Sequence, residues 1–130
     1  MAINPEAEAF FAALSAHGDV AAEFAAALAK LGEYEVRSAP GDHGAQYAVT
    51  AKTVFGGAAG MASTYWRLPP EDRTIALATG AAETDLGPEW VEVRLFRPDW
   101  PNPDLRHWAL RAYRYARARR VTALRVGQDL

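Results

Sequence analysis

The spacing of apolar residues at the start of the chain predicts two short helices. The first helix has one apolar stripe, formed by Phe10, Phe11 and Leu14. Asn4 is its expected N-cap and Pro5 its first residue. The second helix repeats the helical period at Val20, Phe24, Ala27, Leu28 and Leu31. Asp19 is its expected cap and Gly32 lies just past its end. Because the connection is short, we expect a helical hairpin over one common core.

Between residues 33 and 97 the period changes to two, which predicts strands. The expected strands cover residues 34–38, 46–55, 61–68, 74–79 and 89–97. The glycine-rich stretch 56–60 is interpreted as a turn, because it lacks the Gly-Lys-Ser/Thr ending of a phosphate-binding loop. Connections this short join antiparallel neighbours. The fold class is therefore expected to be α+β, with an antiparallel four- to five-stranded meander sheet.

Alternation along these strands assigns side chains to the two faces of the sheet. The face expected to pack against the helices carries Tyr47, Val49, Phe55, Ile75, Leu77, Val91, Val93 and Leu95. The opposite face is expected to present Lys52, Tyr65, Arg67, Trp90, Glu92, Arg94 and Phe96. Placing Tyr65 and Arg67 on this face is a choice, because Trp66 and Leu68 compete for the core. The mixture of aromatic and charged groups is typical of neither a sealed core nor a solvated surface.

The chain ends with an amphipathic helix rich in arginine. Asn102 is its expected cap, followed by Pro103 in the first turn. At 100° per residue its apolar side is formed by Leu105, Trp108, Ala109, Ala112, Tyr115 and Ala116. Its basic side carries Arg106, Arg111, Arg114, Arg117 and Arg120, with Tyr113 at the edge. We expect this helix to pack on one sheet face and to turn its basic side outward.

Charge is distributed unevenly along the chain. Residues 1–105 carry seven basic and fifteen acidic side chains, whereas residues 106–130 carry seven basic and one acidic. The net charge is nevertheless −2. The basic segment therefore either contacts an outside partner or lies against the acidic remainder of its own fold. Arginines late in a helix also interact favourably with the helix dipole, by about 0.3–1 kcal/mol each, which is a structural explanation for Arg117, Arg119 and Arg120.

Composition excludes several classes of protein. One domain over residues 1–130 is expected from the length. There is no cysteine, which excludes disulfide scaffolds, thiol nucleophiles and cysteine-bound metals. The histidines show no metal-binding spacing, and Asp42-His43 has no accompanying nucleophile motif. We expect no metal, no cofactor and no catalytic residue. The first residues lack a signal-peptide pattern and no apolar run reaches membrane-spanning length, so a cytoplasmic location without membrane binding is expected.

Three functions from different classes fit these observations. The favoured one is a small non-enzymatic interaction protein, such as an adaptor, inhibitor, chaperone or immunity protein, that also pairs as a homodimer. Its candidate binding residues are Tyr65, Trp90, Arg94, Arg106, Arg111, Tyr113, Arg114, Arg117 and Arg120. The first alternative is a curved-sheet domain that binds a small apolar or carboxylate-bearing ligand, with or without catalysis, lined by Tyr65, Trp66, Trp90 and Arg94. The second is nucleic-acid binding through the basic helix, which the pI near 5.9 disfavours.

Overall fold

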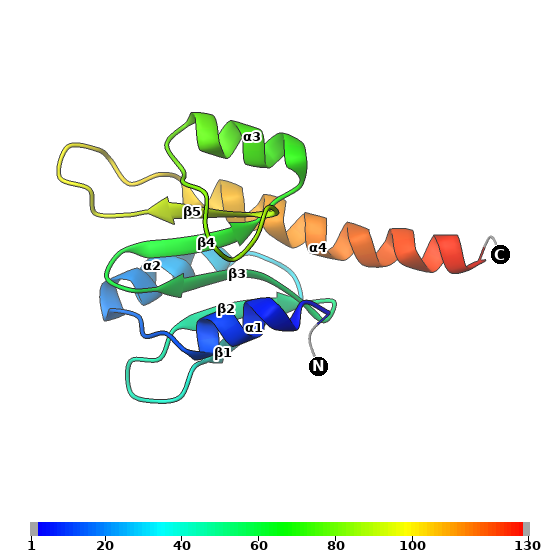
Figure 1. Ribbon diagram of the computed structural model, residues 1–130, viewed down its shortest axis with the longest axis horizontal. Coiled ribbons are helices and arrows are strands. Elements are labelled where there is room, and N and C mark those ends of the chain that lie inside the picture. Colours follow the sequence, from blue (N-terminus) through cyan, green and yellow to red (C-terminus); the bar gives the residue numbers. More distant parts are fainter. Residues whose placement is uncertain (1–2, 129–130) are drawn as a thin grey trace.

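A computed structural model of the chain describes residues 3–128, with side chains through residue 118. Figure 1 shows an antiparallel sheet with helices on both faces. The helices of the described part are α1 (Pro5–Ala12), α2 (Gly18–Leu28), α3 (Pro70–Ala78) and α4 (Leu105–Gln128). Its strands are β1 (Glu35–Ser38), β2 (Gln46–Thr50), β3 (Thr53–Ala59), β4 (Ser63–Arg67) and β5 (Trp90–Arg94).

The sheet is a meander in which every neighbouring pair of strands is antiparallel, in the order β1-β2-β3-β4-β5. The expected α+β class and meander are therefore confirmed, as is the docking of the C-terminal helix on one face. Helices α2 and α4 cover that face, and the core between them and the sheet includes Phe24, Trp66, Val91, Trp108 and Ala112. Helix α1 covers the other face, where its Phe11 packs with Tyr47 and Trp90.

The two N-terminal helices do not form the expected hairpin over one core. They lie on opposite faces of the sheet because residues 13–17 cross its end. In this crossing, the N–H of Ala16 donates to the carbonyl of His43 at 2.7 Å, and the N–H of His17 donates to the carbonyl of Gly60 at 2.8 Å. These bonds hold the chain against the ends of the strands and direct it to the second face.

The segment expected as a strand at 74–79 belongs to helix α3. Pro70 occupies its first turn together with Glu71 and Asp72, which favour the positive end of the helix dipole. The apparent alternation was misleading, because Ile75 is 54% exposed and only Ala76 of this helix is buried. The expected strand at 46–55 is instead two strands, so the sheet keeps five.

A two-residue turn at Ala51-Lys52 joins β2 to β3. Both residues have positive φ, at 49° and 62°, in the pattern that Asn-Gly normally supplies. Because of this turn Val49 pairs with Val54, and Phe55 points to the opposite face. The prediction that Val49 shares a face with Phe55 is therefore wrong. Tyr47 and Val49 pack under α1, and Phe55 packs under α4.

The glycine-rich stretch expected as a turn lies largely within β3, where residues 56–59 are buried. Its glycines make room for aromatic rings from both sides. A β-carbon on Gly57 would overlap the ring of Phe11, and one on Gly56 would lie 2.7 Å from the ring of Trp66. At Gly56 and Gly57 the turn interpretation is wrong, because close approach and not loop geometry requires glycine there. Gly60, with a φ of 71°, does lie at the turn between β3 and β4.

Of the three expected helix caps, Asn4 lies at the cap position of its helix, but its side chain makes no cap hydrogen bond. The side chain of Asn4 exchanges two hydrogen bonds of 2.9 Å with the backbone of Val54. His17 caps α2, since its Nδ1 accepts from the N–H of Asp19. Asn102 accepts from the N–H of Phe96 at 2.8 Å, and α4 begins after Asp104, whose carboxylate accepts from the N–H of Arg106. The hydrogen bond to Asn102 fixes the backbone at Phe96.

Candidate functional site

An open groove lies where β4 begins and β5 ends. Figure 1 shows these two strand ends at its left. Its volume is about 580 Å³. Three separate stretches of the chain contribute to it: Leu14 just after α1, the β3–β4 turn with the start of β4, and the end of β5 with the residues that follow it. Its principal side chains are Leu14, Met61, Ser63, Tyr65, Glu92, Arg94, Phe96 and Arg97. We call this feature the β4–β5 groove.

Large apolar side chains line the rim of the β4–β5 groove and face solvent. Met61 is 72% exposed, Phe96 is 45% exposed and Leu14 is 38% exposed. A smaller adjoining pocket shares Arg94 and Arg97 with the groove and adds the exposed Trp100. Single exposed apolar residues are common, but several gathered around one concavity are typical of an interaction site.

The backbone holds Phe96 in an unfavourable conformation. Its φ of 58° lies in the left-handed region, which a bulky residue rarely adopts. The N–H of Leu95 donates to the carbonyl of Ala62 as the last bond of the strand pair, and the N–H of Phe96 then bonds to Asn102. This arrangement directs the chain away from the sheet and leaves the ring of Phe96 on the groove rim. Local strain of this kind is found at functional sites.

The floor of the β4–β5 groove is polar because of the strand register. Ser63 pairs with Arg94 and Tyr65 pairs with Glu92, so these four side chains share one face. The Ser63 hydroxyl donates to the Glu92 carboxylate, and Arg94 Nε lies 3.6 Å from the same carboxylate.

Tyr65 connects this floor to the core under α1. Its ring packs edge-on against Phe10 at 5.3 Å and Phe11 at 5.6 Å. Burial raises the pKa of the Tyr65 phenol, and the negative charge of Glu92 raises it further, against smaller opposing effects of Ser63 and Arg94. The hydroxyl is therefore protonated near neutral pH and is able to donate a hydrogen bond.

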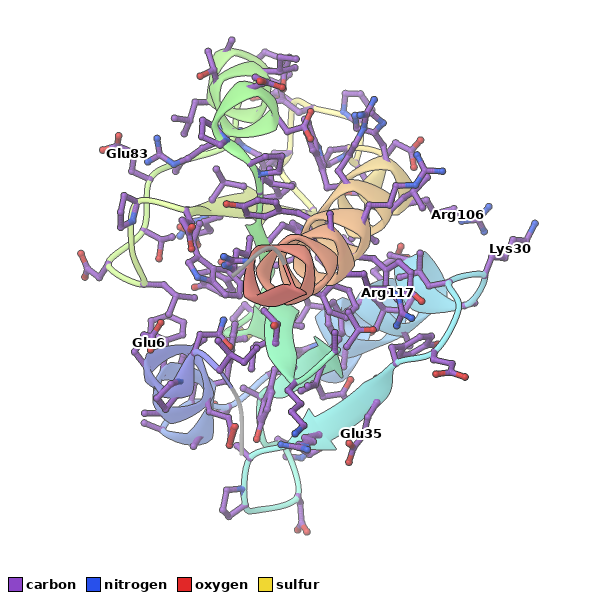
Figure 2. All side chains as sticks on the ribbon, turned by 90° about the vertical axis from the view of Figure 1, so that its right-hand side faces the viewer. Glu6, Lys30, Glu35, Glu83, Arg106 and Arg117 are labelled. Atoms are coloured by element: carbon purple, nitrogen blue, oxygen red, sulfur yellow. The ribbon has the colours of Figure 1, made fainter. Side chains whose placement is uncertain are left out.

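The arginines expected on the basic side of α4 are exposed where the structure describes their side chains. Arg106, Arg111 and Arg114 are exposed, and no carboxylate within the described side chains lies at salt-bridge distance from them. Figure 2 shows Arg106 and Lys30 extending to the same side of the molecule, away from Glu6 and Glu83. The helix dipole does not explain Arg106, because this residue lies in the first turn of α4.

The other described candidate residues of α4, Tyr113 and Arg117, contact neighbouring side chains. Arg117 donates to the hydroxyl of Thr50 at 3.0 Å and lies over the ring of Tyr113 at 5.5 Å. The Tyr113 ring is half-buried and packs edge-on against Phe55. The side chain of Arg120 lies outside the described residues. None of these residues lines the β4–β5 groove.

Trp90 does not contribute to a binding surface. It is buried under α1, whereas Trp66 is buried on the opposite face under α2 and α4. The expectation that Trp66 and Trp90 line one ligand site is therefore wrong. Of the sheet residues proposed from sequence, Tyr65 and Arg94 are the two that the structure brings together in the groove.

Arg67 is also buried, with 1% of its surface exposed, although the sequence placed it on an open face. Its Nε donates to Glu89 at 2.8 Å, and its guanidinium lies 4.5 Å from the ring centre of Tyr115 on α4. The hydroxyl of Tyr115 also donates to Glu89. These contacts tie the end of β4 to α4, which is a structural role.

Leu14, Met61, Ser63 and Arg97 were not predicted from the sequence as site residues. Ser63 could have been found, because strand alternation places it on the face of Tyr65. The others come from loops and a helix end, and their convergence is a tertiary property.

Comparison of the chain with protein-family models, curated proteins and solved structures gives no match. Within residues 3–128, no helix combines the length and apolarity that a membrane span requires. The same residues contain no cluster of three or more histidine and carboxylate side chains able to hold a metal ion.

Proposed function

We propose that this protein is a non-enzymatic interaction domain that binds a segment of a partner protein in the β4–β5 groove. The observation that carries the proposal is the gathering of Leu14, Met61 and Phe96 around two arginines. Aromatic residues, methionine and arginine are enriched at protein interfaces, and interface hot spots are often aromatic residues or arginine.

Charge indicates the chemistry of the partner segment. Arg94 and Arg97 lie on the groove, and Glu92 is its one nearby carboxylate among the lining residues. A complementary segment therefore carries apolar side chains next to carboxylates. The exposed arginines of α4 favour the same acidic class of partner, because they are not neutralised within the described part of the fold.

A second copy of the chain and a nucleic acid are the competing occupants. The homodimer expected from the sequence would bury the same apolar rim, whereas a nucleic acid would use the α4 arginines and leave the rim unexplained. The cytoplasmic location expected from the sequence remains part of the proposal.

Site-specific photo-crosslinking tests the proposal. A benzophenone amino acid is placed at Met61 and, as a control, at Ile75, which is 54% exposed on α3 and outside the groove. In the producing cell we expect one discrete adduct from position 61 and none from position 75. Adding Arg94→Glu should reduce that adduct while thermal unfolding stays unchanged, because Arg94 is on the surface.

The captured protein is then identified, purified and titrated. Arg94→Glu should weaken its binding at least about tenfold, as expected for a charged interface contact, and Ile75→Ala should leave it unchanged. Equal adducts from both positions, or equal affinities of the variants, would refute the groove as the binding site. An adduct with twice the mass of the 14.1 kDa chain would show that a second copy of the chain, and not a different protein, occupies the groove.

A further inference from the structure

The floor of the β4–β5 groove indicates what it recognises. We infer that the Arg94 guanidinium and the Tyr65 hydroxyl hold a carboxylate that lies next to a large apolar side chain of the bound segment. This inference depends on the proposed function and makes it more specific.

Arg94 has the capacity for such a contact. Its side chain is 67% exposed, and its Nε lies 3.6 Å from the Glu92 carboxylate. A guanidinium presents five N–H donors in a planar fork that matches a carboxylate, so most of its donors remain for a ligand. Strand pairing fixes the backbone from which this side chain extends, since Arg94 is the last residue of β5 and pairs with Ser63.

Glu92 restricts which anion the floor accepts. Its carboxylate accepts the Ser63 hydroxyl and is mostly buried, with 20% of the side chain exposed, so it stays on the groove floor. Together with Arg94 and Arg97 it leaves the lining a net charge of +1. A single carboxylate balances this charge, whereas a dianionic phosphate would meet stronger repulsion from Glu92.

Tyr65 supplies a second donor on the same face. Its ring is fixed against Phe10 and Phe11, so the hydroxyl is held in place before a ligand binds. A donor held in place in this way loses little entropy on binding. Met61, Leu14 and Phe96 form the apolar wall beside this polar pair.

NMR titration of the ¹⁵N-labelled protein with matched probes tests the inference. The probes are N-acetyl-phenylalanine, its uncharged amide, N-acetyl-aspartyl-phenylalaninamide and phenyl phosphate. We expect amide shifts at Met61 and Phe96, with either carboxylate probe binding about tenfold tighter than the amide, as a charge-assisted hydrogen bond provides. Arg94→Gln should abolish that preference and Tyr65→Phe should reduce it, whereas Arg111→Gln on α4 should leave it intact.

The outcomes separate this inference from the proposed function. If the acid and the amide bind equally at the groove, the carboxylate contact is overturned and the apolar groove stands. If no probe shifts the groove amides, both fail. Tighter binding of phenyl phosphate would overturn the selection of a single negative charge. A preference for N-acetyl-phenylalanine over the aspartyl probe would assign the carboxylate to a chain end, and the reverse preference would assign it to an acidic side chain.

Discussion

Replacing Gly57 by alanine is expected to destabilise the protein, although alanine is normally the better residue in a regular element. The added β-carbon would overlap the ring of Phe11. That ring has no room to retreat, because Phe11 is fully buried and its ring centre lies 5.9 Å from Tyr47, 5.6 Å from Tyr65 and 6.2 Å from Trp90. The strand or the aromatic cluster must therefore shift to accommodate the methyl group.

The expected size of the effect combines two opposing contributions. Overpacking a rigid core costs about 1–3 kcal/mol, and the surrounding rings place this site near the upper limit. Replacing a glycine also lowers the conformational entropy of the unfolded chain, which stabilises the folded protein by about 0.4–1 kcal/mol. The free energy of unfolding should thus fall by about 2 kcal/mol. In a Phe11→Leu background the obstruction is gone, and Gly57→Ala should become neutral or slightly stabilising.

Urea unfolding of the two single variants and the double variant measures this coupling. Gly18→Ala is the matched control, because a β-carbon on Gly18 meets nothing within 4 Å and the residue lies in α2. This control should be neutral or should stabilise the protein by up to about 1 kcal/mol. If the effects of Gly57→Ala and Phe11→Leu add within about 0.5 kcal/mol, the steric explanation is wrong.

Three further changes test other parts of the fold. The double substitution Ala51→Asn and Lys52→Gly should raise the free energy of unfolding by about 1 kcal/mol in urea, because both residues have positive φ; no gain would contradict the turn geometry. Asn4→Ala should lower it by about 2 kcal/mol, since the N–H and carbonyl of Val54 lose their partner, and faster hydrogen exchange at Val54 should accompany the loss. Folding raises the pKa of Tyr65, so its contribution to stability is full below the ordinary tyrosine pKa of 10.0 and is lost as pH rises through the folded pKa. Tyr65→Phe should therefore make the free energy of unfolding fall less steeply above pH 10, and should remove the late phase of the phenolate titration followed at 295 nm. An unchanged titration would refute the assignment.

The strands were predictable where alternation was uninterrupted. From Trp90 to Leu95 every second side chain is apolar and faces α2 and α4, and this pattern alone placed Glu92 and Arg94 on the other face. Alternation did not predict the turn at Ala51-Lys52, because nothing in these residue types marks a tight turn. It also failed at Gly56-Gly57, because the rings that require glycine there come from other elements.

The arrangement of α1 and α2 was not predictable from local pattern. Each helix shows its own apolar stripe, but the stripe does not say which sheet face it covers. The answer depends on bonds between residues 13–17 and the strand ends near His43 and Gly60, which are distant in sequence. The β4–β5 groove was not predictable for the same reason, because Leu14 reaches it only where residues 13–17 cross the end of the sheet.

The charge pattern located the unusual helix but did not point to the candidate site. An exposed arginine costs little stability, since water solvates it and salt screens it, so unpaired arginines can be retained on α4 whether or not a partner binds them. Exposed methionine and phenylalanine side chains gathered at one concavity are harder to retain, because they favour aggregation. The rim of the β4–β5 groove is therefore stronger evidence of a binding surface than the larger basic face of α4.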